Sequence, residues 1–258
     1  MLSKIKKILI KKNKKKIICL TAYSKNFSEE IDKHADITLV GDSLGSVLYE
    51  YKTTRKVSLD TMIEHSKSVR KGVKKSLMVV DMPYKSYSNK SEALKNAKKI
   101  IKYTKCDAVK LEGGRKIKNI VKHLIKNKVS VMGHLGILPQ SMVGKFKSKG
   151  KTEKEKNTLI KDSKMLESLG VFAIVLECVN SNTAKKITNS IKIPTIGIGS
   201  SFHCDGQILV TDDLLGLNET KIKFVKKFIN IRKNIEQGIK KFKFEVINKK
   251  YPSKKYSY

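Results

Sequence analysis

The sequence lacks a long apolar run and a segment resembling a secretory leader. No part of its 258 residues approaches the roughly 18 consecutive apolar residues that a membrane-spanning helix needs. Residues 1–16, MLSKIKKILIKKNKKK, are basic, but lysines interrupt their apolar residues and no small-residue cleavage site follows. We therefore expect no association with a membrane, and a cytoplasmic protein.

Cysteine is scarce and is not spaced for a metal site. The chain has four cysteines, Cys19, Cys106, Cys178 and Cys204, with no CxxC pair among them. In a chain of this size with no sign of secretion, such cysteines are expected to be reduced thiols. The pattern gives no support for a structural zinc site or a disulfide framework.

Acidic residues are few, since 23 Asp and Glu stand against 56 Lys and Arg, a formal net charge of +33. This excess raises the question of nucleic-acid binding. The lysines, however, are spread over the whole length, and arginine, which specific nucleic-acid surfaces favour, is scarce. Many fall on the solvent side of predicted helices, as in EALKNAKKIIKYTK (92–105). We expect no specific nucleic-acid binding.

Short apolar runs alternate with longer amphipathic stretches along the chain. The runs typical of buried strands are Ile17–Thr21, Ile37–Val40, Leu77–Val80, Ala108–Leu111, Val129–Met132, Phe172–Leu176, Thr195–Ile198 and Ile208–Val210. Apolar residues at three- and four-residue steps predict helices over 59–70, 91–103, 117–126, 155–169 and 182–190. Ser58 and Ser91 stand where two of these helices are expected to start.

Eight strands separated by helices predict parallel strands joined by helical crossovers. At about 250 residues in one piece, the natural closure is a (β/α)8 TIM barrel, here a single domain over 1–258 with a basic N-terminal segment and a helical tail from Lys221. A doubly wound open sheet is the alternative, but the chain has no GxGxxG turn and no P-loop to support it.

Polar residues stand at the carboxyl ends of successive predicted strands: Asp42 and Ser43, Asp81, Lys110 and Glu112, His134, and Glu177. Each has an ordinary explanation when taken alone, since an acid after a strand is most often a helix cap and a lone histidine is most often part of the core. A barrel, however, gathers the carboxyl ends of its strands at one rim. Lys110 and Glu112 are also two residues apart, so they share a strand face. The set therefore predicts one site.

The residue types in this set suit one kind of chemistry. Carboxylate oxygens without cysteine select a hard cation, Mg²⁺ before Zn²⁺. Such an ion, when chelated by a 2-oxo acid, polarises the keto oxygen and stabilises an enolate. A lysine beside it can pair with the substrate carboxylate or the developing oxyanion. Glu177, which closes an apolar strand, is the natural general base for a proton on carbon.

At these residues the chain resembles the ketopantoate hydroxymethyltransferase (3-methyl-2-oxobutanoate hydroxymethyltransferase) family. The matching segments run in family order and are LTAY (20–23), LVGDSLG (39–45), VKLEGG (109–114), GHLGILPQS (133–141), VLECV (175–179), IPTIGIGS (193–200), and DGQILV and DLLG within 205–216. They are distributed over nearly the whole chain.

The resemblance implies a phosphoenolpyruvate mutase/isocitrate lyase-like barrel, usually a homodecamer, that requires Mg²⁺. It implies transfer of a one-carbon unit from 5,10-methylenetetrahydrofolate to 3-methyl-2-oxobutanoate, giving 2-dehydropantoate in pantothenate biosynthesis. By motif, Asp42, Asp81 and Glu112 match metal positions, and Asp42, Ser43, Asp81 and Lys110 match substrate-binding positions. Glu177 matches the base that removes the C3 proton, and His134 a supporting residue of the pocket.

The chain departs from the family pattern at three places: Ser24 replaces an aspartate, the 46–56 loop lacks the usual Gly-His pair, and IGIGSS replaces IGIGAG. The loop follows the second predicted strand, so it bears on substrate preference and rate. One alternative is another Mg²⁺-dependent barrel enzyme acting on 2-oxo acids, although the K-K-C-G-H loop typical of the mutase and lyase barrels is absent. Another is a non-catalytic barrel that binds anions or RNA, which the intact set of polar residues argues against.

Overall fold

The computed structural model describes residues 3–142, 147–219 and 222–258. The chain divides into two compact units, Met1–Val210 and Thr211–Tyr258. The first unit holds the barrel described below and every predicted site residue. The single domain expected over the whole chain stays a prediction.

Eight parallel strands pair in sequence order and close into a barrel. They are β1 (Ile17–Thr21), β2 (Ile37–Val40), β3 (Leu77–Asp81), β4 (Ala108–Glu112), β5 (Val131–Gly136), β6 (Ala173–Glu177), β7 (Thr195–Ile198) and β8 (Gly206–Leu209). Closure pairs β8 with β1, where Gly206 lies opposite Ile17. A Cβ at Gly206 would stand 2.4 Å from the Ile17 carbonyl oxygen, so only glycine permits this approach. The predicted barrel is confirmed.

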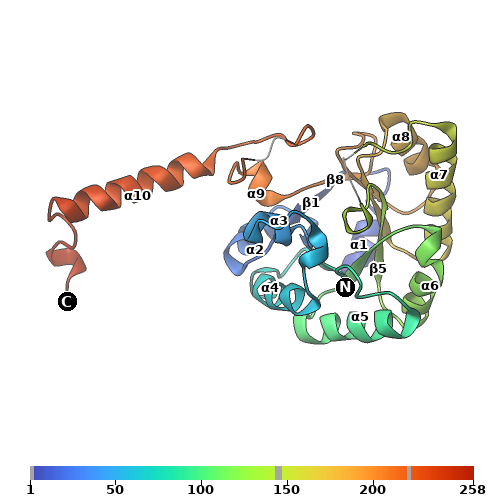
Figure 1. Ribbon diagram of the computed structural model, residues 1–258, viewed down its shortest axis with the longest axis horizontal. Coiled ribbons are helices and arrows are strands. Elements are labelled where there is room, and N and C mark those ends of the chain that lie inside the picture. Colours follow the sequence, from blue (N-terminus) through green and yellow to red (C-terminus); the bar gives the residue numbers. More distant parts are fainter. Residues whose placement is uncertain (1–2, 143–146, 220–221) are drawn as a thin grey trace. The chain divides into compact units, whose positions relative to one another are not determined.

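Helices cover much of the outside of the barrel (Figure 1). They are α2 (Lys25–Ile31), α3 (Leu44–Tyr49), α4 (Leu59–Gly72), α5 (Lys90–Thr104), α6 (Lys118–Lys126), α7 (Glu153–Ser168) and α8 (Ser181–Ser190). Ser58 caps α4 as predicted, because its hydroxyl accepts a hydrogen bond from the Thr61 amide. The helix expected to start at Ser91 is instead capped by Asn89, which accepts from the Glu92 amide. Residues 199–205 join β7 to β8 without a helix.

The side chains inside the barrel form two layers. The lower layer is apolar and includes Ile37, Leu39, Leu77, Val79, Ala108, Met132, Ala173 and Val175. Side chains alternate along a strand, so the next inward positions toward the carboxyl ends are Asp81, Lys110, Glu112, His134 and Glu177. The predicted polar residues thus form the upper layer, on a packed apolar floor.

A short helix, α1 (Lys4–Leu9), contributes Ile8 to the lower core layer. Lysines in and just after α1 pair with aspartates that directly precede strands: Lys4 with Asp107 at 3.5 Å, Lys11 with Asp36 at 2.5 Å, and Lys12 with Asp205 at 2.8 Å. The basic N-terminal segment therefore binds the end of the barrel opposite the polar layer, which we call the base.

Two predicted strands are misplaced. The fifth was expected at Val129–Met132 but runs over Val131–Gly136, because Gly133 and His134 belong to the strand despite ending its apolar run. The eighth was expected at Ile208–Val210 and runs over Gly206–Leu209. Strands β3, β4 and β6 each extend one residue further than expected, to include Asp81, Glu112 and Glu177 as their last residues.

The second unit contains α9 (Thr211–Leu214) and the long helix α10 (Ile231–Ile247), which falls within the predicted basic tail. Lys221, where that tail was expected to start, lies outside the described residues. None of the helices in the described parts of the chain is long and apolar enough to cross a membrane. All four cysteines are free thiols, as expected, and all except Cys178 are buried.

Candidate active site

The register of the strands brings the predicted residues together at the carboxyl-end rim. Asp81 on β3 pairs with Lys110 on β4, and Glu112 on β4 pairs with His134 on β5. Glu177 on β6 lies opposite Gly136 on β5. The contacts that follow from this register form a continuous buried polar cluster over four adjacent strands.

Lys110 and Asp81 form a buried ion pair. The Lys110 Nζ lies 3.0 Å from Asp81 Oδ1, and both side chains are almost fully buried. Burial disfavours the ammonium, but the charges of Asp81, Glu112 and Asp42 outweigh that effect and raise the pKa of Lys110. The lysine is therefore a permanent cation, able to pair with a substrate carboxylate or a developing oxyanion.

His134 lies between two glutamates. Its Nδ1 is 3.5 Å from Glu112 Oε1, and its Nε2 is 3.2 Å from Glu177 Oε2. Burial and the Lys110 charge act to lower the pKa of His134, but the two carboxylates raise it to about 9. The raised pKa favours the imidazolium form, whose charge lies between the two glutamates. The supporting role predicted for His134 stays a prediction, but its position is central.

Asp42 is not a helix cap. Its main-chain amide donates to Asp81 Oδ2 at 3.1 Å, and its Oδ2 accepts from Gln140 Nε2 at 2.8 Å. Burial, followed by repulsion from Asp81 and Glu112, raises the pKa of Asp42 to about 8. Ser43 beside it shares a hydrogen bond of 2.8 Å with the Tyr23 hydroxyl.

The cluster has the chemistry of a magnesium site but not a preformed cage. Four carboxylates, Asp42, Asp81, Glu112 and Glu177, stand against the two cations Lys110 and His134. Burial first, and then repulsion from Asp81 and Glu112, raises the pKa of Asp42, so a bound cation would favour its ionised form. Among the described residues, no three His, Cys, Asp or Glu side chains converge to hold a metal. Mg²⁺ is commonly held by one or two carboxylates with water and substrate, so this arrangement fits it.

Three residues of the cluster's surroundings were not predicted as site residues: Tyr23, Tyr87 and Gln140. Gln140 bonds to Asp42 and Glu112, and Tyr87 donates to Gln140. Gln140 stands within the motif GHLGILPQS, directly after Pro139, so its position in the family pattern was the available signal. Nothing in the sequence around Tyr87 indicates its contact, which spans 53 positions.

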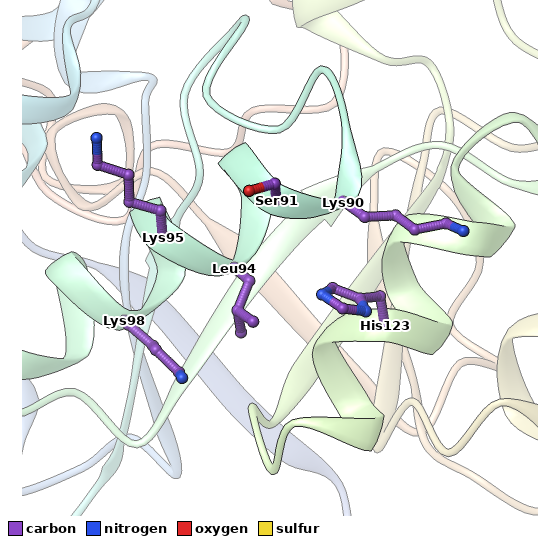
Figure 2. Close-up of a pocket in the computed structure, with 6 residues that line it drawn as sticks. All are labelled: Lys90, Ser91, Leu94, Lys95, Lys98 and His123. Carbon is purple, nitrogen blue, oxygen red and sulfur yellow. The ribbon is translucent and has the colours of Figure 1, made fainter.

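A separate hollow of about 500 Å³ lies between α5 and α6, and its lining is drawn in Figure 2. It is lined by Lys90, Ser91, Leu94, Lys95, Lys98 and His123, none of which belongs to the polar cluster. In Figure 2, Lys90 and Lys95 extend in different directions. Ligand sites combine an apolar pocket with a few convergent polar groups, and this hollow has no such convergence. The polar cluster is the candidate active site.

The family model for ketopantoate hydroxymethyltransferase matches residues 3–254. The chain belongs to this family. The 3-methyl-2-oxobutanoate hydroxymethyltransferase of Pelagibacter ubique is 64% identical over 255 residues, which cover 99% of each chain. The ketopantoate hydroxymethyltransferase family predicted from the motifs is therefore confirmed, and with it the expectation of an enzyme that transfers a hydroxymethyl group.

Solved structures of other enzymes share the fold of this family member. A phosphoenolpyruvate phosphomutase from Streptomyces platensis subsp. rosaceus has a TM-score of 0.63 at 8% identity, covering 95% of this chain and 87% of its own. A phosphonopyruvate hydrolase, solved with oxalate and Mg²⁺, has a TM-score of 0.60 at 10% identity, covering 99% and 93%. At these identities the likeness shows the fold alone, which is the predicted (β/α)8 barrel.

Proposed function

We propose that the chain transfers a hydroxymethyl group from 5,10-methylenetetrahydrofolate to 3-methyl-2-oxobutanoate, giving 2-dehydropantoate for pantothenate biosynthesis. Its family and the name of its 64% identical relative support the reaction. The observation that carries the proposal is the buried cluster at the rim, which pairs Asp81 with Lys110 and links Glu112 to Glu177 through His134. This cluster has the acid, base and cation groups that enolisation of a 2-oxo acid requires.

In this proposal Glu177 is the general base. Its side chain is the most exposed of the cluster's ion-paired groups, at 16%, so a substrate can reach it from the rim. The Glu177 carboxylate takes the proton from C3 of the oxo acid, and the electron pair of that bond moves toward the keto oxygen. The His134 imidazolium, 3.2 Å from Glu177 Oε2, holds the carboxylate in one orientation for this transfer.

Lys110 and Ser43 are proposed to bind the substrate. The Lys110 ammonium is held beside Asp81 and offers positive charge to the substrate carboxylate or the enolate oxygen. The Ser43 hydroxyl, oriented by Tyr23, stands next to Asp42 at the same rim. Asp42 and Asp81, with Glu112, would hold Mg²⁺, which when bound polarises the keto oxygen of the substrate.

A turnover assay with 5,10-methylenetetrahydrofolate and several branched 2-oxo acids tests the reaction. We expect 3-methyl-2-oxobutanoate to be the best substrate and product formation to stop when EDTA removes Mg²⁺. In D₂O without folate, the chain is expected to exchange the C3 hydrogen of 3-methyl-2-oxobutanoate when Mg²⁺ is saturating. Absence of both turnover and exchange under these conditions would refute the proposal.

The homodecamer and the cytoplasmic location are proposed from the family resemblance. Light scattering coupled to size-exclusion chromatography is expected to give a mass ten times the 29.2 kDa of one chain. High salt is the suitable condition, because it screens repulsion between strongly basic subunits. A monomer at micromolar concentration in high salt would exclude a stable decamer.

A further inference from the structure

Gln140 is buried at the rim of the barrel, just past the end of β5. It is the middle residue of a short 3-10 turn, Pro139–Ser141, and only 3% of its surface is exposed. A buried amide must satisfy two donors and an acceptor, so its partners show what holds it there.

Gln140 donates hydrogen bonds to two carboxylates of the cluster. Its main-chain amide donates to Glu112 Oε2 at 3.0 Å, and its side-chain Nε2 donates to Asp42 Oδ2 at 2.8 Å. The same Nε2 also donates to the carbonyl of Met82, the residue directly after Asp81, at 2.9 Å. One residue therefore connects the ends of β2, β3 and β4, and it fixes the position of Asp42 relative to Glu112.

The orientation of the Gln140 amide is itself fixed. Tyr87 donates its hydroxyl proton to Gln140 Oε1, which leaves Nε2 to face Asp42. Burial, followed by the charge of Glu112, raises the pKa of Tyr87, so the phenol keeps the proton it donates. An amide also carries no charge, so Gln140 holds Asp42 without supplying the positive charge that the carboxylates lack.

Arg55 holds the main chain of Gln140 by a hydrogen bond to its carbonyl. Its Nε donates to the Gln140 carbonyl at 2.8 Å, and its guanidinium lies 5.0 Å from the centre of the Tyr84 ring. Arg55 belongs to the 46–56 loop, where the chain departs from the family pattern. The loop therefore contacts the carboxylates through Gln140.

We propose that Gln140 is a positioning residue that sets Asp42 and Glu112 for Mg²⁺, and that Arg55 couples the 46–56 loop to this arrangement. The inference rests on the proposed function for its Mg²⁺ chemistry. Residues that orient metal-binding carboxylates change metal affinity or activity by about 10- to 100-fold when they are replaced. The loop thereby acts on the rate of enolisation rather than through contact with the substrate alone.

The test compares Gln140→Leu with the wild-type chain. Leucine has a similar size but removes the donor to Asp42, while the main-chain donor to Glu112 remains. Titration calorimetry with MgCl2 alone is expected to show a Kd for Mg²⁺ raised about 10- to 100-fold. The C3 exchange rate in D₂O at saturating Mg²⁺ is expected to fall as well. A merely structural role would lower the melting temperature and leave the Mg²⁺ Kd of the folded chain unchanged.

Two further variants keep the inference testable if Gln140→Leu does not fold. Tyr87→Phe leaves the amide in place but removes the hydroxyl that orients it, and Arg55→Met removes the donor to the Gln140 carbonyl. Both are expected to raise the Mg²⁺ Kd by less than Gln140→Leu. Gln207→Leu is the matched control, because Gln207 also donates to a main-chain carbonyl, that of Ser201, on the opposite side of the barrel.

The outcomes separate this inference from the proposed function. If the wild-type chain turns over substrate and all three variants bind Mg²⁺ within about twofold of it, the positioning role is wrong and the function stands. The same conclusion follows if the active wild-type chain binds no Mg²⁺. If the wild-type chain shows no turnover, the proposed function fails, and the Mg²⁺ titrations still decide the role of Gln140.

Discussion

Glu177→Gln is the most direct perturbation of the proposed mechanism. Glutamine keeps the size of the side chain and an oxygen that can accept from His134 Nε2, which lies 3.2 Å from the carboxylate. The His134 ring and the Glu112 contact on its other side are therefore expected to stay in place. What the variant loses is the ability to accept a proton from carbon.

The expected effect follows from the role of a general base. Such a group contributes about 10²- to 10⁴-fold to a rate, which corresponds to about 2.7–5.4 kcal/mol of activation free energy. We expect the rate of C3 hydrogen exchange in D₂O to fall by this factor. The Kd for Mg²⁺ is expected to stay within about threefold, because the ion is assigned to Asp42, Asp81 and Glu112.

Proton NMR of 3-methyl-2-oxobutanoate in D₂O, with saturating Mg²⁺ and no folate, measures the exchange rate directly. Glu64→Gln is the matched control, because Glu64 is an exposed glutamate that pairs with Lys67 on the surface of α4. The control is expected to exchange at the wild-type rate. If Glu177→Gln also exchanged at that rate, Glu177 would not be the base.

Three other variants test the scaffold of the barrel. Asp32→Asn weakens hydrogen bonds from three successive main-chain amides over 74–76, whose pull on the carboxylate outweighs burial and lowers its pKa. The stability that the Asp32 carboxylate provides is therefore present above its ordinary pKa of 3.8 and is lost as the pH falls through the pKa in the folded chain. Urea unfolding of the variant is expected to show a loss of about 1.5–3 kcal/mol at pH 7 and a smaller loss below pH 3.8. An equal loss at pH 7 and below pH 3.8 would contradict this. Lys12→Met leaves the buried Asp205 carboxylate without its cationic partner and should lower the free energy of unfolding by about 3–5 kcal/mol. An unchanged urea midpoint would show that the pair does not stabilise the base. Gly136→Ala places a Cβ 2.2 Å from the Glu177 carbonyl oxygen, at a residue whose φ is 100°. C3 exchange is expected to slow at least about tenfold, with about 1–3 kcal/mol of destabilisation. Exchange at the wild-type rate would mean that the rim tolerates the added methyl group.

The barrel could be predicted because its strands are ordinary buried strands. Ile37–Val40 is fully buried and apolar except for Thr38, and its predicted limits match the structure. The errors lie where strands carry the site. In β5 the apolar run stops at Met132, but the strand continues through Gly133 and His134. These two residues pair with β4 and β6, and this pairing outweighs their low preference for a strand.

The members of the site could also be predicted, since residue type and strand position carry that information. Their contacts could not. The hydrogen bond from Gln140 to Asp42 spans 98 positions. The hydrogen bond from Tyr87 to Gln140 joins the segment after β3 to the segment after β5. No local pattern specifies such pairs. Short helices such as α1 and α2 were missed for a similar reason, because few-turn helices are stabilised by packing rather than by propensity.

The base of the barrel has a consequence for how the protein is made. Lys12 leaves the ribosome long before Asp205, which lies 193 positions later and directly precedes the last strand. The segment around α1 is therefore synthesised first, and it gains the last of its three ion pairs only when Asp205 has been made. Joining such distant segments carries the entropy of closing the whole loop between them. Closure of the barrel therefore waits for β8, which pairs with β1, and a chain that stops before β8 cannot form the closed barrel.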